Sequence, residues 1–231
     1  SVITASADVE QLAIGPGGLI EGFAPGAIHV DMSTIAPDSA RKLAARYAER
    51  GIGWLDAPVS GGAGGAREAT LAIMAGGAPD TLERVRPLLA YLGKSVVHIG
   101  PAGAGQVAKA CNQMIMVNAI QACAEAMRLA GAHGVDPVRV REALMGGSAA
   151  SKVLDVMGGR MARRDFAAGI QSRLHHKDFA ILMAAARQLG APLPVAAQTW
   201  QQLNALIALG GGRDDSASLL KVLEPFEGTS Q

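Results

Sequence analysis

Apolar and polar positions follow two different patterns along the chain, and the change falls near Gly105. Before that glycine, short apolar runs alternate with segments of helical spacing, a pattern that predicts alternating strands and helices. The predicted strands are Ser1–Ala5, Ala27–Asp31, Gly53–Pro58, Thr70–Ala75 and Ser95–Ile99. The predicted helices between them are Asp8–Ile14, Pro37–Arg50 and Pro79–Leu92.

From Gly105 onward the spacing of apolar residues is helical throughout. The helices predicted there are 104–131, 136–145, 174–189, 193–209 and 214–223. Strands that alternate with helices indicate an α/β layer with a largely parallel sheet, whereas consecutive helices indicate an all-α domain. We therefore expect an α/β domain over residues 1–104 and a helical domain over residues 105–231, joined by the long helix that starts at the boundary.

The composition narrows the classes of partner. Hydrophobic residues fill 49% of the 231 positions, which is enough for a buried core. A charged fraction of 18% and a formal net charge of +1 give no argument for a nucleic-acid or membrane-surface partner. Aromatic residues are 3% of the chain, which disfavours base stacking. Polar residues interrupt the long apolar runs, so we expect no membrane partner.

The two cysteines indicate a reducing compartment. Cys111 and Cys123 lie twelve residues apart in one predicted helix. At about 1.5 Å of rise per residue they are separated by roughly 18 Å, too far for a disulfide. Because unpaired thiols are the rule in the cytoplasm, we expect a cytoplasmic location.

Two segments carry hydroxyl groups and glycines at the ends of predicted strands. Asp31–Pro37 reads Asp-Met-Ser-Thr-Ile-Ala-Pro and lies where open α/β folds bind ligands. Its alternative role is to cap the following helix. Asp56–Gly62 is followed by Ala63–Ala66, a run of small residues whose backbone N–H groups suit a carboxylate or a phosphate. The alternative for that run is a flexible surface loop.

The predicted long helix places Lys109 and Asn112 on one face, because they are three residues apart. The residues around Lys109 are apolar. A lysine that loses hydration there releases its proton more readily, which suits proton transfer. The alternative is a lysine at the edge of the core whose ammonium group reaches solvent.

A fourth segment, Leu174–Phe179, reads Leu-His-His-Lys-Asp-Phe at the start of a predicted helix. Its lysine and aspartate are candidates for a functional role, and the alternative is that they are simple surface charges. No carboxylate or cysteine cluster with ligand spacing accompanies its two histidines, so we expect no metal site. The glycines of Gly100–Gly105 follow a predicted strand and open a helix. Their G-x-x-G-x-G order indicates a tight turn and close helix packing rather than phosphate binding.

Taken together and in this order, these segments resemble the β-hydroxyacid dehydrogenase family. The matching blocks are DMSTIAP, DAPVSGG followed by TLAIMAGG, HIGPAGAGQVAKACNQ, and LHHKDF. The resemblance implies a partial Rossmann-like α/β domain followed by an all-α domain, similar to the C-terminal domain of 6-phosphogluconate dehydrogenase. It also implies an NAD(P)-dependent oxidoreductase of small hydroxy acids.

The resemblance further implies how the substrate is bound. Lys109 matches the catalytic lysine, which moves a proton to or from the substrate oxygen. Asn112 matches the asparagine that orients the substrate, one turn further along the helix. Ser60, Gly61 and Gly62 match the Ser-Gly-Gly whose amides and hydroxyl hold the substrate carboxylate.

On the cofactor side, Thr34 matches a hydroxyl residue near the nicotinamide end, Lys177 a second lysine that reaches the cofactor, and Asp178 the acid beside it. The chain departs from the family at Ala69, where Gly is usual. It also has no G-x-G-x-x-G, and about 60 residues of two leading βα units have no counterpart. The choice between NAD and NADP is therefore open, and we expect this chain to bind dinucleotides weakly or not at all.

Within the family, the Leu-His-x-Lys-Asp form and the stretch Asn204–Asp214 are most similar to the tartronate semialdehyde reductase branch. The alternatives are a 3-hydroxyisobutyrate dehydrogenase and, from another functional class, a truncated non-catalytic dimerisation module. The predicted helix 104–131 has too few polar residues for any broad side to face water. Together with the resemblance, this implies a homodimer or homotetramer formed through the helical domain.

Overall fold

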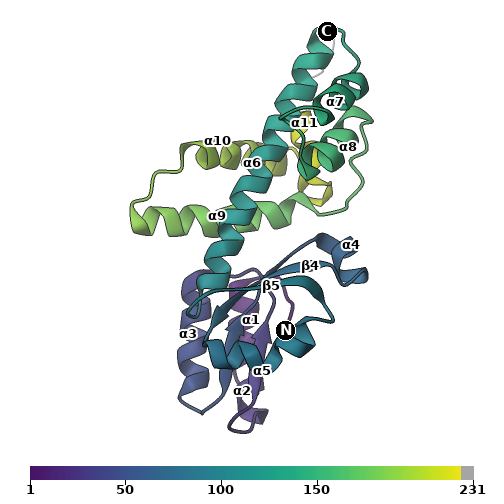
Figure 1. Ribbon diagram of the computed structural model, residues 1–231. Coiled ribbons are helices and arrows are strands. Elements are labelled where there is room, and N and C mark those ends of the chain that lie inside the picture. The colour runs from purple at the N-terminus through teal and green to yellow at the C-terminus, as the bar shows by residue number, and fades with distance from the viewer. Residues whose placement is uncertain (225–231) are drawn as a thin grey trace. The chain divides into compact units, whose positions relative to one another are not determined.

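The computed structural model describes residues 1–224. Packing divides the chain into two compact units, Ser1–Asn112 and the residues from Gln113 onward. Strands occur only in the first of these units among the described residues, and the second is helical (Figure 1). The expected fold class, an α/β part followed by an all-α part, is confirmed. Within residues 1–224, no helix is both long and apolar enough to cross a bilayer.

The first unit is a twisted sheet with helices packed against it (Figure 1). Its strands are β1 Ile28–Asp31, β2 Gly53–Asp56, β3 Val59–Ser60, β4 Leu71–Gly77 and β5 Gly93–Gly100. Its helices are α1 Ser6–Ile14, α2 Leu19–Gly22, α3 Pro37–Ala48, α4 Gly62–Arg67 and α5 Pro79–Leu89. Both α3 and α5 begin with a proline, whose missing N–H is not needed in a first helical turn.

The sheet is mixed rather than largely parallel, so that expectation is wrong. β1 pairs with β2 and β4 with β5 in parallel, but β4 runs antiparallel to both β2 and β3. The reason lies in the connections. A parallel return needs a crossover of a dozen or more residues, and α5 provides one between β4 and β5. Between β3 and β4 there is only the six-residue helix α4 with its short flanks, and the chain reverses direction.

The predicted strand Ser1–Ala5 is also wrong, because the segment forms no regular ladder. Its first residue still bonds to the strand beside it. The Ser1 amino group donates to the carbonyl of Val30 at 2.9 Å, and the N–H of Met32 donates to the carbonyl of Ser1 at 2.8 Å. The segment is therefore extended and held next to β1 without continuing the sheet.

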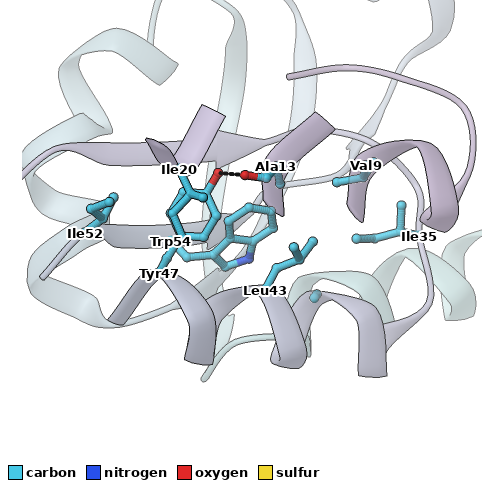
Figure 2. Packing of buried hydrophobic residues seen from close by; sticks show 9 residues of the cluster. Val9, Ala13, Ile20, Ile35, Leu43, Tyr47, Ile52 and Trp54 are labelled. Carbon is cyan, nitrogen blue, oxygen red and sulfur yellow. Dashed lines mark hydrogen bonds between the residues drawn. The ribbon is translucent and has the colours of Figure 1, made fainter. Parts of the chain in front are cut away.

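One face of the sheet packs against α1, α2 and α3 through an apolar cluster (Figure 2). Tyr47 and Trp54 lie at its centre with their rings steeply inclined to each other and their centroids 5.2 Å apart, an arrangement that adds about 0.5–1.5 kcal/mol beyond area burial. The Tyr47 hydroxyl donates to the carbonyl of Ala13 at 3.4 Å. The other face packs against α5 through Leu55, Ile73, Leu82, Val85 and Leu89, among others.

The second unit contains most of the long helix α6, Ala104–Ala132, whose first nine residues belong to the first unit. Its other helices are α7 Pro137–Met145, α8 Gly159–Ala162, α9 Ser172–Leu189, α10 Pro194–Ala208 and α11 Leu219–Val222. A π-helical turn, Leu154–Gly158, precedes α8. The predicted helix 214–223 is a 3₁₀ turn, Ser216–Ser218, followed by the short α11.

Candidate active site

Asp56 fixes the first turn of α6 to the end of β2. Its fully buried carboxylate accepts the N–H of Gly103 at 2.7 Å and the N–H of Gln106 at 3.0 Å. N–H groups at a helix start have no partner within the helix, so the carboxylate satisfies donors that would otherwise be buried alone. Burial raises the pKa of Asp56 to about 6, while these two N–H donors act in the opposite direction.

Gly105 brings the same turn into contact with the sheet. A Cβ on this residue would lie 2.4 Å from the carbonyl oxygen of Met74 in β4 and 2.6 Å from that of Asp56 in β2. No side chain fits there. The glycines of Gly100–Gly105 thus serve a tight turn, with φ of +86° at Gly103, and close helix packing, as the sequence indicated.

Lys109 lies one helical turn beyond Gly105 and therefore on the face of α6 that meets the sheet. The residue is buried, with 8% of its surface exposed. This burial favours the interpretation of a desolvated lysine over that of a lysine at the edge of the core. Asn112, partly buried, follows on the same side of the helix.

The segment with Ser60, Gly61 and Gly62 borders the same strand β4. Ser60 pairs with Ala72 of β4, and the N–H of Met74 donates to the carbonyl of Pro58 at 3.0 Å. Gly61 and Gly62 have φ of +139° and +63°, values that L side chains rarely adopt. The small residues after them form α4, so the flexible-loop alternative is wrong.

Thr34 lies in the loop after β1, between two residues whose backbone is fixed. The Ser33 carbonyl accepts from Nε2 of Gln106 at 2.8 Å, and the Ile35 N–H donates to Oε1 of Gln106 at 3.1 Å. The following helix α3 has Ala36 at its N-cap and no side-chain cap, so the helix-capping alternative for these hydroxyls is wrong.

Lys177 and Asp178 lie in the second unit, at the start of α9. The Lys177 Nζ is 3.0 Å from Oδ1 of Asp178, and Nε2 of Gln113 donates to Oδ2 of Asp178 at 2.6 Å. Asp178 is buried and Lys177 is partly buried. The alternative of simple surface charges is therefore wrong for this pair.

The two histidines before this pair have separate partners. Nδ1 of His175 is 2.6 Å from the Ser216 hydroxyl, and Nε2 of His176 is 2.9 Å from Oδ1 of Asn204. The His176 ring also stacks on Trp200 with 4.5 Å between centroids. No group of three or more metal-ligating side chains occurs within residues 1–224.

The roles of three buried polar residues were not predicted from the sequence. Asp56 fixes the start of α6, Gln106 bonds to the backbone on both sides of Thr34, and Gln113 bonds to Asp178. Asp56 stands at the end of a predicted strand, and Gln106 precedes Lys109 by three residues. These positions were the features of the sequence that could have indicated a role for Asp56 and Gln106. Their partners lie far away in the sequence, so spacing alone does not identify them.

Comparison with known proteins gives matches over both units. Residues 1–100 match the NAD binding domain of 6-phosphogluconate dehydrogenase, and residues 103–223 match the NAD-binding domain of NADP-dependent 3-hydroxyisobutyrate dehydrogenase. The chain is 43% identical to 2-hydroxy-3-oxopropionate reductase of Escherichia coli K12, over 94% of this chain and 74% of that protein. It is 39% identical to 3-hydroxyisobutyrate dehydrogenase of Pseudomonas aeruginosa, over 85% and 68%.

A solved structure of Mycobacterium tuberculosis 3-hydroxyisobutyrate dehydrogenase with L-serine superposes with a TM-score of 0.86 at 30% identity, covering 96% of this chain and 78% of that one. The fold and these matches define an NAD(P)-dependent oxidoreductase of the hydroxyacid dehydrogenase type. The chain belongs to the β-hydroxyacid dehydrogenase family.

Proposed function

We propose that this protein reduces 2-hydroxy-3-oxopropionate, also called tartronate semialdehyde, and oxidises the corresponding hydroxy acid in the reverse direction. The observation that carries the proposal is the burial of Lys109, one helical turn beyond Gly105. Gly105 packs against β4, the strand with which Ser60 pairs. The 43% identity to a 2-hydroxy-3-oxopropionate reductase over 94% of the chain supports this choice of substrate.

The small molecules named with these relatives, or their reduced forms, share one chemical feature. Glycerate (the reduced form of 2-hydroxy-3-oxopropionate), 3-hydroxyisobutyrate and L-serine are all carboxylates with a primary alcohol on the next carbon but one. They differ only in the group on the carbon between, which is a hydroxyl, a methyl or an ammonium. A site for this class therefore needs one anchor for the carboxylate and one proton-transfer group for the alcohol.

The first unit contains candidates for both tasks. Ser60, Gly61 and Gly62 are assigned to the carboxylate, because a hydroxyl and backbone amides beside glycines with positive φ leave room for a close approach. Lys109 is assigned to the alcohol or aldehyde oxygen, and Asn112 to the orientation of the substrate. During reduction the Lys109 ammonium gives its proton to the substrate oxygen.

The cofactor is assigned to Thr34, Lys177 and Asp178. A hydroxyl at the carboxyl end of a parallel strand fits a dinucleotide, since ligands bind at that edge in open α/β sheets. A lysine oriented by a buried carboxylate fits a polar or anionic part of the same ligand. NAD(P)H, when bound, supplies the hydride. The residues that distinguish NAD from NADP are not among these three, so the assignment covers both cofactors.

The same proposal includes assembly and location. Ile115 and Leu129 are exposed apolar residues on α6, which supports a homodimer or homotetramer formed through the helical unit. Cys111 and Cys123 are both free thiols, which supports the cytoplasm.

The test compares the oxidation of D-glycerate, L-glycerate, 3-hydroxyisobutyrate and L-serine by the purified full-length protein, with NAD⁺ and with NADP⁺. We expect kcat/KM for one glycerate enantiomer to exceed kcat/KM for 3-hydroxyisobutyrate and for L-serine by at least about 10-fold. That is the usual effect of one group in a binding pocket. A higher kcat/KM for 3-hydroxyisobutyrate would move the protein to that branch. No oxidation of any of them would contradict the enzyme assignment and favour the non-catalytic module.

A further inference from the structure

Gln106 holds the loop after β1 at two points. Its Oε1 accepts the N–H of Ile35 at 3.1 Å, and its Nε2 donates to the carbonyl of Ser33 at 2.8 Å. The two bonds stand on either side of Thr34. Gln106 is 1% exposed, so water does not compete for either bond. The acceptor and the donor of one amide side chain thus fix the backbone before and after a single residue.

The backbone of Gln106 is fixed in turn by Asp56. The Gln106 N–H donates to Oδ2 of Asp56 at 3.0 Å, and the other carboxylate oxygen accepts from Gly103 at 2.7 Å. The backbone position from which the Gln106 side chain reaches the loop is therefore fixed at the start of α6. Lys109 stands three residues further along this helix. One helical turn thus carries both the lysine and the amide that holds the Thr34 loop.

The loop is anchored from its other side as well. The Ser33 hydroxyl donates to Oδ1 of Asp31 at 2.6 Å and accepts the N–H of Ile3 at 2.9 Å. These contacts tie Ser33 to β1 and to the extended N-terminal segment, whereas the N–H of Ile35 is held by Gln106. Without the Gln106 side chain, Ser33 stays in place and the backbone beyond Thr34 loses this acceptor.

We propose that Gln106 is a positioning residue that sets Thr34 relative to Lys109, and with it the distance over which hydride is transferred. The inference rests on the proposed function, in which Thr34 contacts the cofactor and Lys109 serves the substrate oxygen. Glutamine is required because both ends of the amide are used. An ionised glutamate retains an acceptor for Ile35 but offers no donor to the Ser33 carbonyl, and methionine fills a similar volume with neither.

The first test measures the cofactor and the hydride step separately in the full-length protein. For Gln106→Met we expect a weaker Kd for NADH or NADPH, measured by fluorescence titration. We also expect a hydride-transfer rate lower by up to about 10²-fold, the effect of an ångström-scale misplacement, with a larger primary isotope effect from deuterated cofactor. The KM for the hydroxy acid is expected to change less than about twofold, the limit of what such a comparison resolves.

Gln121→Met is the matched control, because Gln121 is a buried glutamine on the same helix whose Nε2 donates at 2.9 Å to Glu125 of that helix. It is expected to change the melting temperature but neither the cofactor Kd nor the isotope effect. If Gln106→Met does not fold, Gln106→Glu retains the Ile35 acceptor and gives a smaller change in the same direction.

The second test is a double-mutant cycle of Gln106→Met with Thr34→Val. If Gln106 acts through Thr34, the double variant is no worse in cofactor Kd than the more affected single variant. Additive losses of cofactor affinity would overturn the inference and leave the proposed function intact. A Gln106→Met protein with unchanged cofactor Kd and isotope effect would do the same. If the unsubstituted protein binds neither NADH nor NADPH, the proposed function fails and the inference fails with it.

Discussion

Gln113 and Asp178 join α6 to α9 through a hydrogen bond of 2.6 Å between Nε2 and Oδ2. The other oxygen of Asp178 lies 3.0 Å from Nζ of Lys177, the lysine we assign to the cofactor. A single buried carboxylate therefore links the packing of two helices to the orientation of a cation. Loss of that carboxylate is expected to affect folding stability and cofactor binding at once.

We expect Asp178→Ala to lower the free energy of unfolding by about 1–3 kcal/mol, because Nε2 of Gln113 loses a buried acceptor. The KM for the cofactor is expected to rise in the same variant, since Lys177 loses this carboxylate. Urea unfolding measures the loss of stability, and steady-state kinetics measures the KM for the cofactor.

Asp38→Ala is the control, because Asp38 is 70% exposed and pairs with Arg41 at the surface. Such surface pairs contribute at most about 1 kcal/mol. Equal losses in the two variants would contradict the role of Asp178.

Lys109→Ala is expected to reduce kcat by about 10²-fold or more, the usual contribution of a general acid–base group. Lys109→Arg is expected to give no recovery, because a guanidinium does not release its proton near neutral pH. Initial rates with saturating cofactor and substrate measure both variants. Lys94→Ala, at an exposed position on β5, is the control and should retain full activity. Turnover within a few-fold of the unsubstituted protein in either Lys109 variant would refute the assignment.

The sequence predicted most elements correctly because their apolar positions have regular spacing. In α3, for instance, the buried residues Ala40, Leu43 and Tyr47 recur at three and four residues, and Pro37 marks the start. The region 154–162 was not predicted as helical, since Gly158 and Gly159 weaken the helical signal there. The direction of β4 was also missed, because a pattern of apolar residues predicts a strand but not its neighbour.

A candidate site residue could be predicted only where a reactive side chain stands in an unusual local sequence. Lys109 stands out as a charged residue in an apolar helix, and Ser60 as a hydroxyl before two glycines. Gln106 does not stand out, because its partners Ser33 and Ile35 lie more than seventy residues away in sequence. A buried amide acquires its role only when the fold brings two distant backbone groups to it.

Two glycines on α6 give opposite predictions for the same substitution. Gly105→Ala places a Cβ 2.4 Å from the Met74 carbonyl, and we expect a loss of roughly 1–3 kcal/mol from overpacking together with a lower kcat, since Lys109 is one turn away. Gly131→Ala meets nothing within 4 Å, and we expect a gain of about 0.5–1 kcal/mol from helix propensity with unchanged kcat. Thermal or urea unfolding of both variants is the measurement, and a stable, fully active Gly105→Ala protein would contradict the close packing.

Asp56 is expected to give folding an unusual dependence on pH. Its pKa is about 6 in the folded protein, against an ordinary value of 3.8 for an aspartate in water, chiefly because of burial. The folded state therefore binds the proton more tightly than the unfolded state. The contribution of this group to stability is fully present below about pH 4 and declines as the pH rises through about 6, by on the order of 2–3 kcal/mol.

Asp56→Asn removes this titration and is the variant that tests it. The unfolding free energies of the variant and the unsubstituted protein, measured between about pH 4 and pH 8, should diverge in favour of the variant as the pH rises. Parallel curves would show that Asp56 does not titrate in this range.

The last prediction concerns assembly through α6. Ile115, Ala122 and Leu129 recur every seven residues on this helix and are all exposed, with Ile115 at 68% and Leu129 at 62%. Large apolar side chains exposed on one face of a helix favour the packing of that face against a partner. We expect the protein to be a homodimer or homotetramer. The double variant Ile115→Glu with Leu129→Glu is expected to shift it toward the monomer, because two charges then face the interface.

Tyr91→Glu, at a residue 79% exposed in the first unit, is the control and should leave the mass unchanged. Light scattering behind size exclusion at tens of micromolar, roughly the range in which weak complexes persist, gives the mass of each form, and an unsubstituted protein that is monomeric there, or a double variant with unchanged mass, would contradict an interface on this face of α6.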